Sequence, residues 1–166
     1  MVHVHFSPDN FRSNLMGMLI GRTNVQKDRL LDKYLEPHGV TSSQFKVLII
    51  ISQFGADTPA ELCRSLSLDS GSMTRMLDRL EQKDLLVRSR SVEDRRQVRL
   101  VLTEGGRKLT DLLPKIAADA MNDLLGVLDT AEVEVLDQIL TKVLRSVEDP
   151  ITIARLETFA AKQGDQ

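Results

Sequence analysis

The sequence predicts a mainly α-helical (α+β) fold with a small β-wing, in which long helices flank a winged helix-turn-helix. Over much of the 166-residue chain, apolar residues recur at three- and four-residue steps, the spacing of amphipathic helices. Leu and Met dominate, and aromatic residues make up only 4%, which suits helices better than sheets. In the segment from Asp69 to Leu102, a short capped helix is followed by two short strands around a charged tip.

The first predicted helix runs from Phe11 to Leu35. Pro8-Asp9 precedes it as a start signal, and Pro37 with Gly39 ends it. Its periodic apolar residues are Phe11, Leu15, Met18, Leu19, Leu30, Leu31, Tyr34 and Leu35. The pattern predicts one long amphipathic helix.

A second helix follows a cap at Thr41 or Ser42, and Gln44 is placed to close a capping box. Gly55 ends this helix. Its apolar residues are Phe45, Val47, Leu48, Ile50 and Ile51. Because they lie on nearly every side, we expect this helix to be in the core.

The next two helices have the spacing of a helix-turn-helix. Thr58 and Pro59 predict the start of a short helix that stops near Ser67, and Asp69 caps the following helix after a link of about three residues. On a helical wheel, one side of the second of these helices holds Met73, Leu77, Leu80 and Asp84, and the other holds Thr74, Arg75, Asp78 and Arg79. We therefore expect one face to be buried and a polar, basic face to point outward.

Two strands are predicted after this helix, over Leu85 to Arg90 and Gln97 to Leu102. Val98, Leu100 and Leu102 alternate with other residues in the second strand. The tip from Ser91 to Arg96 contains no Gly or Pro. A two-residue hairpin turn is therefore disfavoured, and a longer loop is predicted.

A long helix is predicted to begin after a cap at Thr103. Its apolar stripe consists of Leu109, Leu113, Ile116, Ala120 and Leu124. Gly105 and Gly106 in its first turn lower helix stability, and Pro114 predicts a kink.

The last predicted helix begins with a capping box of Asp129 and Glu132. Its apolar residues are Val133, Leu136, Ile139, Leu140, Val143 and Leu144. Pro150 breaks the chain, and residues 151–166 are expected either to form a short helix around Ile151 to Ala161 or to fray.

The long helices carry more apolar surface than one small core can cover. Packing against an identical chain about a two-fold axis would bury this surface, although the helices could instead fold back on their own core. We expect residues 9–36 and 103–166 to form dimerisation helices and residues 41–102 to form the winged helix-turn-helix.

Charge is unevenly distributed along the chain. The net charge is −2, but residues 111–166 have a net charge of −6 and residues 1–110 have +4. Residues 86–108 contain 7 basic and 3 acidic side chains. A basic segment beside an acidic tail suggests that one face of the protein lies against phosphate groups, although a solvated surface of mixed charge would give the same counts.

Composition disfavours several classes of protein. The single cysteine, Cys63, cannot form an internal disulfide, and the N-terminus has no export signal, so we expect a protein of a reducing cytoplasm. The longest apolar run, Val47 to Ile51, is too short to span a membrane. The sequence predicts no enzyme and no catalytic, cofactor or metal site, because it lacks a Gly-rich phosphate loop and metal-ligand spacing.

The predicted reading helix and wing favour binding to double-stranded DNA. Ser70, Ser72, Thr74 and Arg75 lie in the first turns of the helix, where such helices meet base edges, and Arg79 lies on the same polar face. At the wing tip, Arg95 and Arg96 suit a narrow minor groove, and Asp94 can hold an arginine in place. An ordinary solvated helix and a mixed-charge loop are the alternatives.

The chain resembles the MarR family of bacterial winged helix-turn-helix regulators from about residue 26 to residue 144. The matching stretches are QKDRLLDKYLEP (26–37), QFKVL (44–48), SMTRMLDRL (72–80), the wing signature of Asp94 and Arg96, and VRLVLTEGG (98–106). The resemblance implies a homodimeric repressor on a pseudo-palindromic operator. It further implies that Arg96 enters the minor groove and that Asp94 braces the wing.

The resemblance also implies release by small aromatic acids or phenols such as salicylate. Thr74 and Arg88 match positions that hold such a ligand, and Ser72, Met76 and Arg79 match a second, more superficial set. Where the family's type member carries a cysteine in its reading helix, this chain has Gln82. Redox sensing at Cys63 and a winged-helix module that docks protein remain alternatives, although retention of the basic wing argues against the latter.

Overall fold

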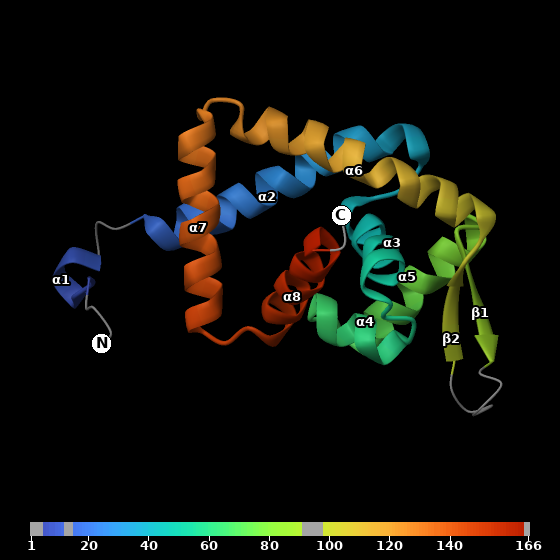
Figure 1. Cartoon of the computed structure of the whole chain (residues 1–166). Helices are drawn as coiled ribbons and strands as arrows, with labels where there is room; N and C mark the ends of the chain where they lie inside the picture. The colour runs from blue at the N-terminus through green and yellow to red at the C-terminus, as the bar shows by residue number, and fades with distance from the viewer. Residues whose placement is uncertain (1–4, 12–14, 91–97, 165–166) are drawn as a thin grey trace.

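Helices make up most of the structure, and a two-stranded hairpin lies at one end (Figure 1). The computed structural model describes residues 5–11, 15–90 and 98–164. In chain order the elements are α1 (Pro8–Phe11), α2 (Met16–Leu35), the 3-10 helix η1 (Glu36–His38), α3 (Ser42–Phe54), α4 (Pro59–Leu66), α5 (Ser70–Gln82), β1 (Leu86–Arg90), β2 (Val98–Leu102), α6 (Glu104–Leu125), α7 (Thr130–Ser146) and α8 (Pro150–Gly164).

The core lies within the winged helix-turn-helix and where α2 and α6 pack on it. Its most deeply buried side chains are Leu35, Val47, Leu48, Leu62, Met73, Leu77, Leu80, Leu86 and Leu113. Most come from α3, α4, α5 and the hairpin, as the apolar faces predicted. Among the described side chains of α7 and α8, none is buried.

Side-chain caps fix where α3, α4 and α7 begin. Thr41, not Ser42, caps α3, and its reciprocal bonds with Gln44 complete the predicted capping box. Thr58 caps α4 with Pro59 in the first turn, and Asp129 with Glu132 opens α7. Each cap satisfies backbone N–H groups that have no partner inside the helix.

The hairpin is antiparallel, with Leu86 opposite Leu102 and Arg90 opposite Val98. Its inward-facing leucines are buried, as the alternation predicted. The predicted tip from Ser91 to Arg96 lies outside the described residues, and the described register ends at Arg90 and Val98. The backbone N–H of Leu100 donates to the Asp57 carbonyl at 2.7 Å, which fastens β2 to the loop between α3 and α4.

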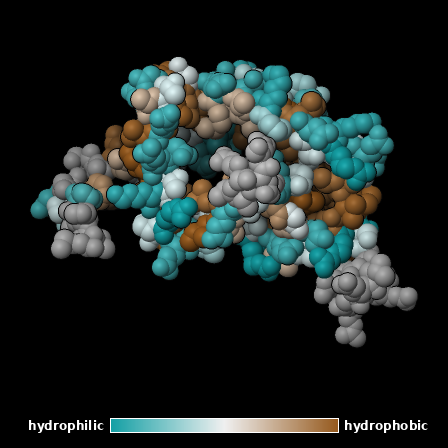
Figure 2. Space-filling model, in the orientation of Figure 1, coloured by the Kyte–Doolittle hydropathy of each residue, from teal (hydrophilic) through white to brown (hydrophobic). Residues whose placement is uncertain are grey.

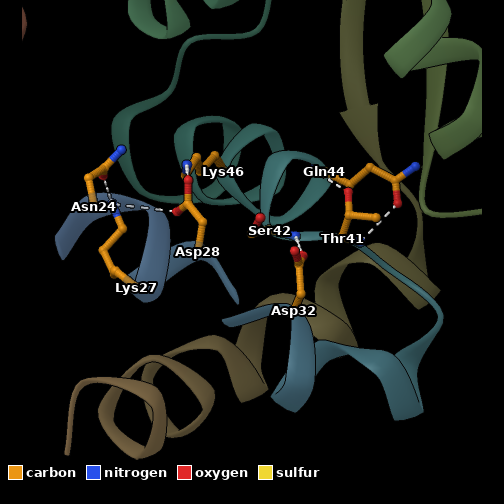
Figure 3. Close-up of polar contacts among 8 residues, drawn as sticks. All are labelled: Asn24, Lys27, Asp28, Asp32, Thr41, Ser42, Gln44 and Lys46. Carbon is orange, nitrogen blue, oxygen red and sulfur yellow. Dashed lines mark hydrogen bonds and ion pairs between the residues drawn. The ribbon is translucent and has the colours of Figure 1, made fainter. Parts of the chain in front are cut away.

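Polar contacts join α2 to α3 (Figure 3). The backbone N–H of Ser42 donates to the Asp32 carboxylate at 2.6 Å, and Lys46 Nζ lies 2.8 Å from Asp28 Oδ2. On the other side of α2, the Tyr34 hydroxyl donates to Asp123 of α6 at 2.7 Å. These bonds fix α2 between α3 and α6.

Two predicted boundaries are wrong. The long first helix begins at Met16, and Pro8–Phe11 forms a separate turn of helix. The start of α2 has no side-chain cap, and Leu15 and Met18 are more than half exposed, so no packing in this chain extends the helix. Asp84 lies beyond the end of α5 with a φ of +54°, and therefore does not share the buried face of that helix.

The C-terminal segment also differs from one of the two expectations. Pro150 occupies the first turn of α8, where its missing N–H costs nothing, and this helix extends to Gly164 instead of fraying. Earlier in the chain, Pro114 lies inside α6, and the helix continues through it.

Packing explains the second glycine of the pair at the start of α6, Gly106. A Cβ atom on Gly106 would lie 1.9 Å from the Leu85 carbonyl oxygen, well inside van der Waals contact. Only glycine allows α6 to begin this close to the turn that leads into β1. The packing requirement outweighs the lower helix propensity that the sequence predicted.

Candidate nucleic-acid interface

Helix α5 has the two faces that a DNA-reading helix requires. Met73, Leu77 and Leu80 are buried against the core. Of the predicted DNA-contacting residues, Ser70, Thr74, Arg75 and Arg79 are exposed, and Ser72 is half-buried. The core therefore fixes the helix and leaves a polar, basic face in solvent.

A hydrogen-bonded cap organises the first turn of α5. The Asp69 carboxylate accepts the Ser72 backbone N–H at 2.8 Å and the Ser72 hydroxyl at 2.7 Å. Arg75 in turn donates to the Ser72 hydroxyl oxygen at 3.1 Å. The cap thus orders the side chains at the end of the helix that would meet base edges.

The bonds from Ser72 lower the pKa of Asp69 below its ordinary value, the side-chain bond most strongly. A carboxylate with a lowered pKa stabilises the folded state above its unfolded pKa, and this contribution is lost as the pH falls through the folded value. We therefore expect the Asp69 carboxyl to titrate below the ordinary aspartate range, and the cap to weaken only as the pH falls through that lowered pKa. An NMR titration of the side-chain carboxyl carbon tests this expectation.

Two variants provide the matched comparison for this titration. Asp69→Asn keeps a good capping residue without a titrating group, so amide protection in α5 should become independent of this group. Asp69→Ala should lose protection at Ser72 throughout the pH range. Titration of wild-type Asp69 at the ordinary aspartate value would contradict the proposed role of the cap.

Arg88, at the start of the hairpin, is held by α5. Its guanidinium contacts Glu81 and lies 2.8 Å from Asp78 Oδ1, and a third bond reaches the Thr74 carbonyl at 3.3 Å. The backbone N–H of Arg88 also donates to Glu81 at 2.9 Å. These contacts join β1 to the reading helix at several points.

The structure brings together the two predicted main effector residues, Thr74 and Arg88. It also places two carboxylates, Asp78 and Glu81, on the same guanidinium, which the sequence analysis did not anticipate. Their i, i+3 spacing on the helix just before an arginine-bearing strand was the available signal. The Thr74 hydroxyl donates to the Ser70 carbonyl at 2.8 Å, so a ligand would compete for this group as well.

The second predicted effector set spreads along α5. Ser72 and Met76 are half-buried, and Arg79 is exposed. Met76 packs against the core, so only part of its side chain is available to a ligand. The predicted wing residues Asp94, Arg95 and Arg96 lie outside the described residues.

Cys63 lies in α4, where it packs partly buried against the core. This position suits a small apolar side chain. Within the described ranges, no three His, Cys, Asp or Glu side chains gather as potential metal ligands. None of the helices in the part of the chain that the structure covers has the length and apolar character of a membrane span.

Known proteins share this architecture. Residues 40–98 match the model of the MarR family. The chain is 41% identical over 130 residues to the multiple antibiotic resistance protein MarR of Escherichia coli K12, a match that covers 78% of this chain and 90% of that protein. The chain is also 34% identical to the transcriptional regulator MhqR of Bacillus subtilis, a match that covers 68% of this chain and 78% of MhqR.

Solved structures agree with these relatives. A cysteine-to-serine mutant of E. coli MarR complexed with operator DNA has a TM-score of 0.72 and 39% identity, covering 84% of this chain and 99% of that one. A MarR family protein of Mycobacterium tuberculosis in complex with p-aminosalicylic acid has a TM-score of 0.64 and 26% identity, covering 76% and 96%. These similarities confirm the predicted winged helix-turn-helix fold.

Proposed function

Because the chain belongs to the MarR family of transcriptional regulators, we propose that it represses transcription as a homodimer bound to a pseudo-palindromic operator. Like its relatives, it is a regulator and not an enzyme. The observation that carries the proposal is α5, whose buried face fixes an exposed basic face beside the hairpin. Such a regulator would act in the bacterial cytoplasm, on the nucleoid when bound to DNA.

Dimerisation is supported by apolar surface at the end of the molecule away from the hairpin. An apolar groove of about 530 Å³ lies between α2, α6 and α7, and its lining includes Leu19, Ile20 and Leu136. Figure 2 shows hydrophobic residues gathered at the left of the view, where α2 begins near α7. In this proposal residues 9–36 and 103–166 supply the dimerisation helices, except that α8 contacts Phe54 of its own chain, and residues 41–102 form each DNA-binding unit.

The two-fold axis would set the distance between the reading helices at about one DNA turn, roughly 34 Å. Ser70, Ser72, Thr74, Arg75 and Arg79 would contact bases or phosphates in the major groove. Arg95 and Arg96 would reach the minor groove, with Asp94 bracing the wing. A gel-shift titration against the promoter of the chain's own gene tests this proposal.

The control in that titration is a shuffled duplex of the same length and composition. We expect a complex with the promoter at salt concentrations where the shuffled duplex stays free. If no protein–DNA complex forms even at low salt, the repressor proposal fails and a winged-helix module that docks protein takes its place.

We further propose that small aromatic acids or phenols such as salicylate release the DNA, and that the regulated genes serve antibiotic or phenolic stress. The relative crystallised with p-aminosalicylic acid supports this class of ligand. Thr74 and Arg88 would form the main site, with Ser72, Met76 and Arg79 as a second set. The ligand must bind the DNA-free arrangement more tightly than the DNA-bound one.

Glu81 should limit the response to an aromatic acid, because its carboxylate already occupies the Arg88 guanidinium. Glu81→Gln removes the charge and keeps an acceptor for the Arg88 backbone N–H. We expect the salicylate concentration that releases half of the operator to fall about two- to fivefold, since a partly exposed ion pair contributes roughly 0.4–1 kcal/mol. Fluorescence anisotropy with labelled operator measures this concentration.

Glu104→Gln is the control for this change, because Glu104 forms an exposed pair with Lys108 at the start of α6. It should leave the half-release concentration unchanged. Equal responses of the two variants would place the acid somewhere other than Arg88.

A further inference from the structure

Helix α8 returns from α7 to the DNA-binding unit of the same chain (Figure 1). The chain reverses after α7 at Glu148, which has a left-handed φ of +52°. Asp149 then accepts the backbone N–H of Thr152 at 2.7 Å and caps the new helix. The turn and cap direct α8 toward α3 and α4.

Phe54, at the end of α3, is the anchor of this contact. Its ring meets the ring of Phe159 edge to face, with centroids 5.7 Å apart and an interplanar angle of 86°. The guanidinium carbon of Arg155 lies 5.1 Å from the centroid of the same ring. Two side chains one turn apart on α8 thus hold one aromatic ring of the DNA-binding unit, in geometries that favour attraction.

The contact is also incomplete. A cavity of about 560 Å³ separates the two elements, with Ile50 and Arg64 on one wall and Ile151 and Thr158 on the other. Phe159 remains 49% exposed. Arg155 is more enclosed, and its burial lowers the pKa of the guanidinium below the ordinary arginine value. A helix held at a few points over a partly filled space can separate without unfolding the core.

The contact between α8 and Phe54 is a second connection between the DNA-binding unit and the rest of the molecule. On one side the DNA-binding unit is joined to the rest of the molecule by α2 and α6, which pack on α3. Helix α8 follows α7 and contacts Phe54 at the end of α3, with α4 on the far wall of the cavity, and so supplies a second attachment. With both attachments in place, the angle between the DNA-binding unit and α7 is fixed.

We propose that α8 is an intramolecular strap, docked on the groove between α3 and α4 of its own chain, that fixes the DNA-binding unit relative to α7. Docked, it holds the two reading helices of a dimer at one separation. Released, it lets each unit rotate, so the protein accepts half-sites at other spacings. The consequence for spacing rests on the proposed dimer and operator, whereas the docking itself does not.

Hydrogen–deuterium exchange of the full-length protein tests the docking. Phe159→Ala and Arg155→Ala each remove one contact with Phe54 and should speed exchange across α8 at least threefold, while core amides in α5 stay protected. Glu157→Ala, an exposed residue on the same helix, is the matched control and should leave exchange unchanged. If α8 exchanges equally fast in wild type and in both contact variants, the strap is overturned.

A photocrosslinking amino acid, p-benzoylphenylalanine, at position 159 identifies what α8 docks on. Adducts with peptides from α3 or α4 within one chain support the strap. Adducts between two chains overturn it in favour of an exchanged helix in the dimer. This experiment needs no DNA, so it separates failure of the strap from failure of the repressor proposal.

Operators with one or two base pairs inserted between the half-sites test the functional consequence. Wild type should prefer the natural spacing, and Phe159→Ala should lose at least threefold of that preference, while Glu157→Ala keeps it. Loss of docking without any change in spacing preference would overturn the role of the strap in DNA binding.

Discussion

Replacing Arg75 with alanine is expected to lower affinity for the operator about 5- to 150-fold, while affinity for unrelated DNA changes little. Arg75 is exposed near the start of α5, and its bond to Ser72 directs it from the capped end of the helix. An arginine in that place can bond two acceptors of one guanine, and such a pair contributes about 1–3 kcal/mol of discrimination. Anisotropy titrations with operators substituted at single base pairs measure the effect.

Arg96→Ala is the informative comparison, because the arginine that we propose for the minor groove should act on all sequences alike. We expect it to weaken binding to specific and unrelated DNA and to flatten the dependence on salt. Arg145→Ala, an exposed arginine on α7, should change neither. If Arg75→Ala and Arg96→Ala behave identically, the division between base reading and backbone contact is wrong.

Gly106→Ala should cause the largest loss of folding stability among glycine-to-alanine changes in the part of the chain that the structure describes. The added Cβ would lie 1.9 Å from the Leu85 carbonyl oxygen, and because this oxygen belongs to the backbone, no side-chain rotation relieves the clash. The start of α6 must move away from the hairpin. We expect a loss of about 3 kcal/mol in the free energy of unfolding, at the upper end for overpacking, measured by urea denaturation.

The neighbouring glycine is a close control. A Cβ on Gly105 would lie 3.1 Å from the Asp84 carbonyl oxygen, a tight contact that a small shift can relieve. Gly105→Ala should therefore change stability by no more than about 1 kcal/mol. Similar losses in both variants would mean that the first turn of α6 is sensitive to any substitution, and not that Gly106 packs against Leu85.

Local chemistry made much of this fold predictable. Thr41 with Gln44, Asp69, and Asp129 with Glu132 each bond to the helix they precede, so the starts of these helices follow from a few adjacent residues. The buried face of α5 followed from helical periodicity, because its buried side chains, Met73, Leu77 and Leu80, recur at three- and four-residue steps.

Features set by distant contacts were not predictable. The position of α8 depends on Phe54 and Phe159, which are more than 100 residues apart and have no common local pattern. The start of α2 was misjudged because periodicity continues where packing within this chain ends. At the candidate site, the exposed polar residues of α5 were predicted from the sequence. The contacts of Asp78 and Glu81 with Arg88 were not, because they depend on β1 lying beside α5.

The close approach of Gly106 to Leu85 also couples the movement of α6 to that of α5. Because α6 begins directly against the turn between α5 and β1, the reading helix and α6 cannot slide past each other. With 22 residues at 1.5 Å each, α6 forms a lever of about 33 Å. Once α8 is undocked, a rotation of about 5° at the far end of α6, near α7, would displace the reading helix by about 3 Å, close to the rise of one base pair. A change too small to alter the fold would therefore suffice to move α5 out of register with its half-site.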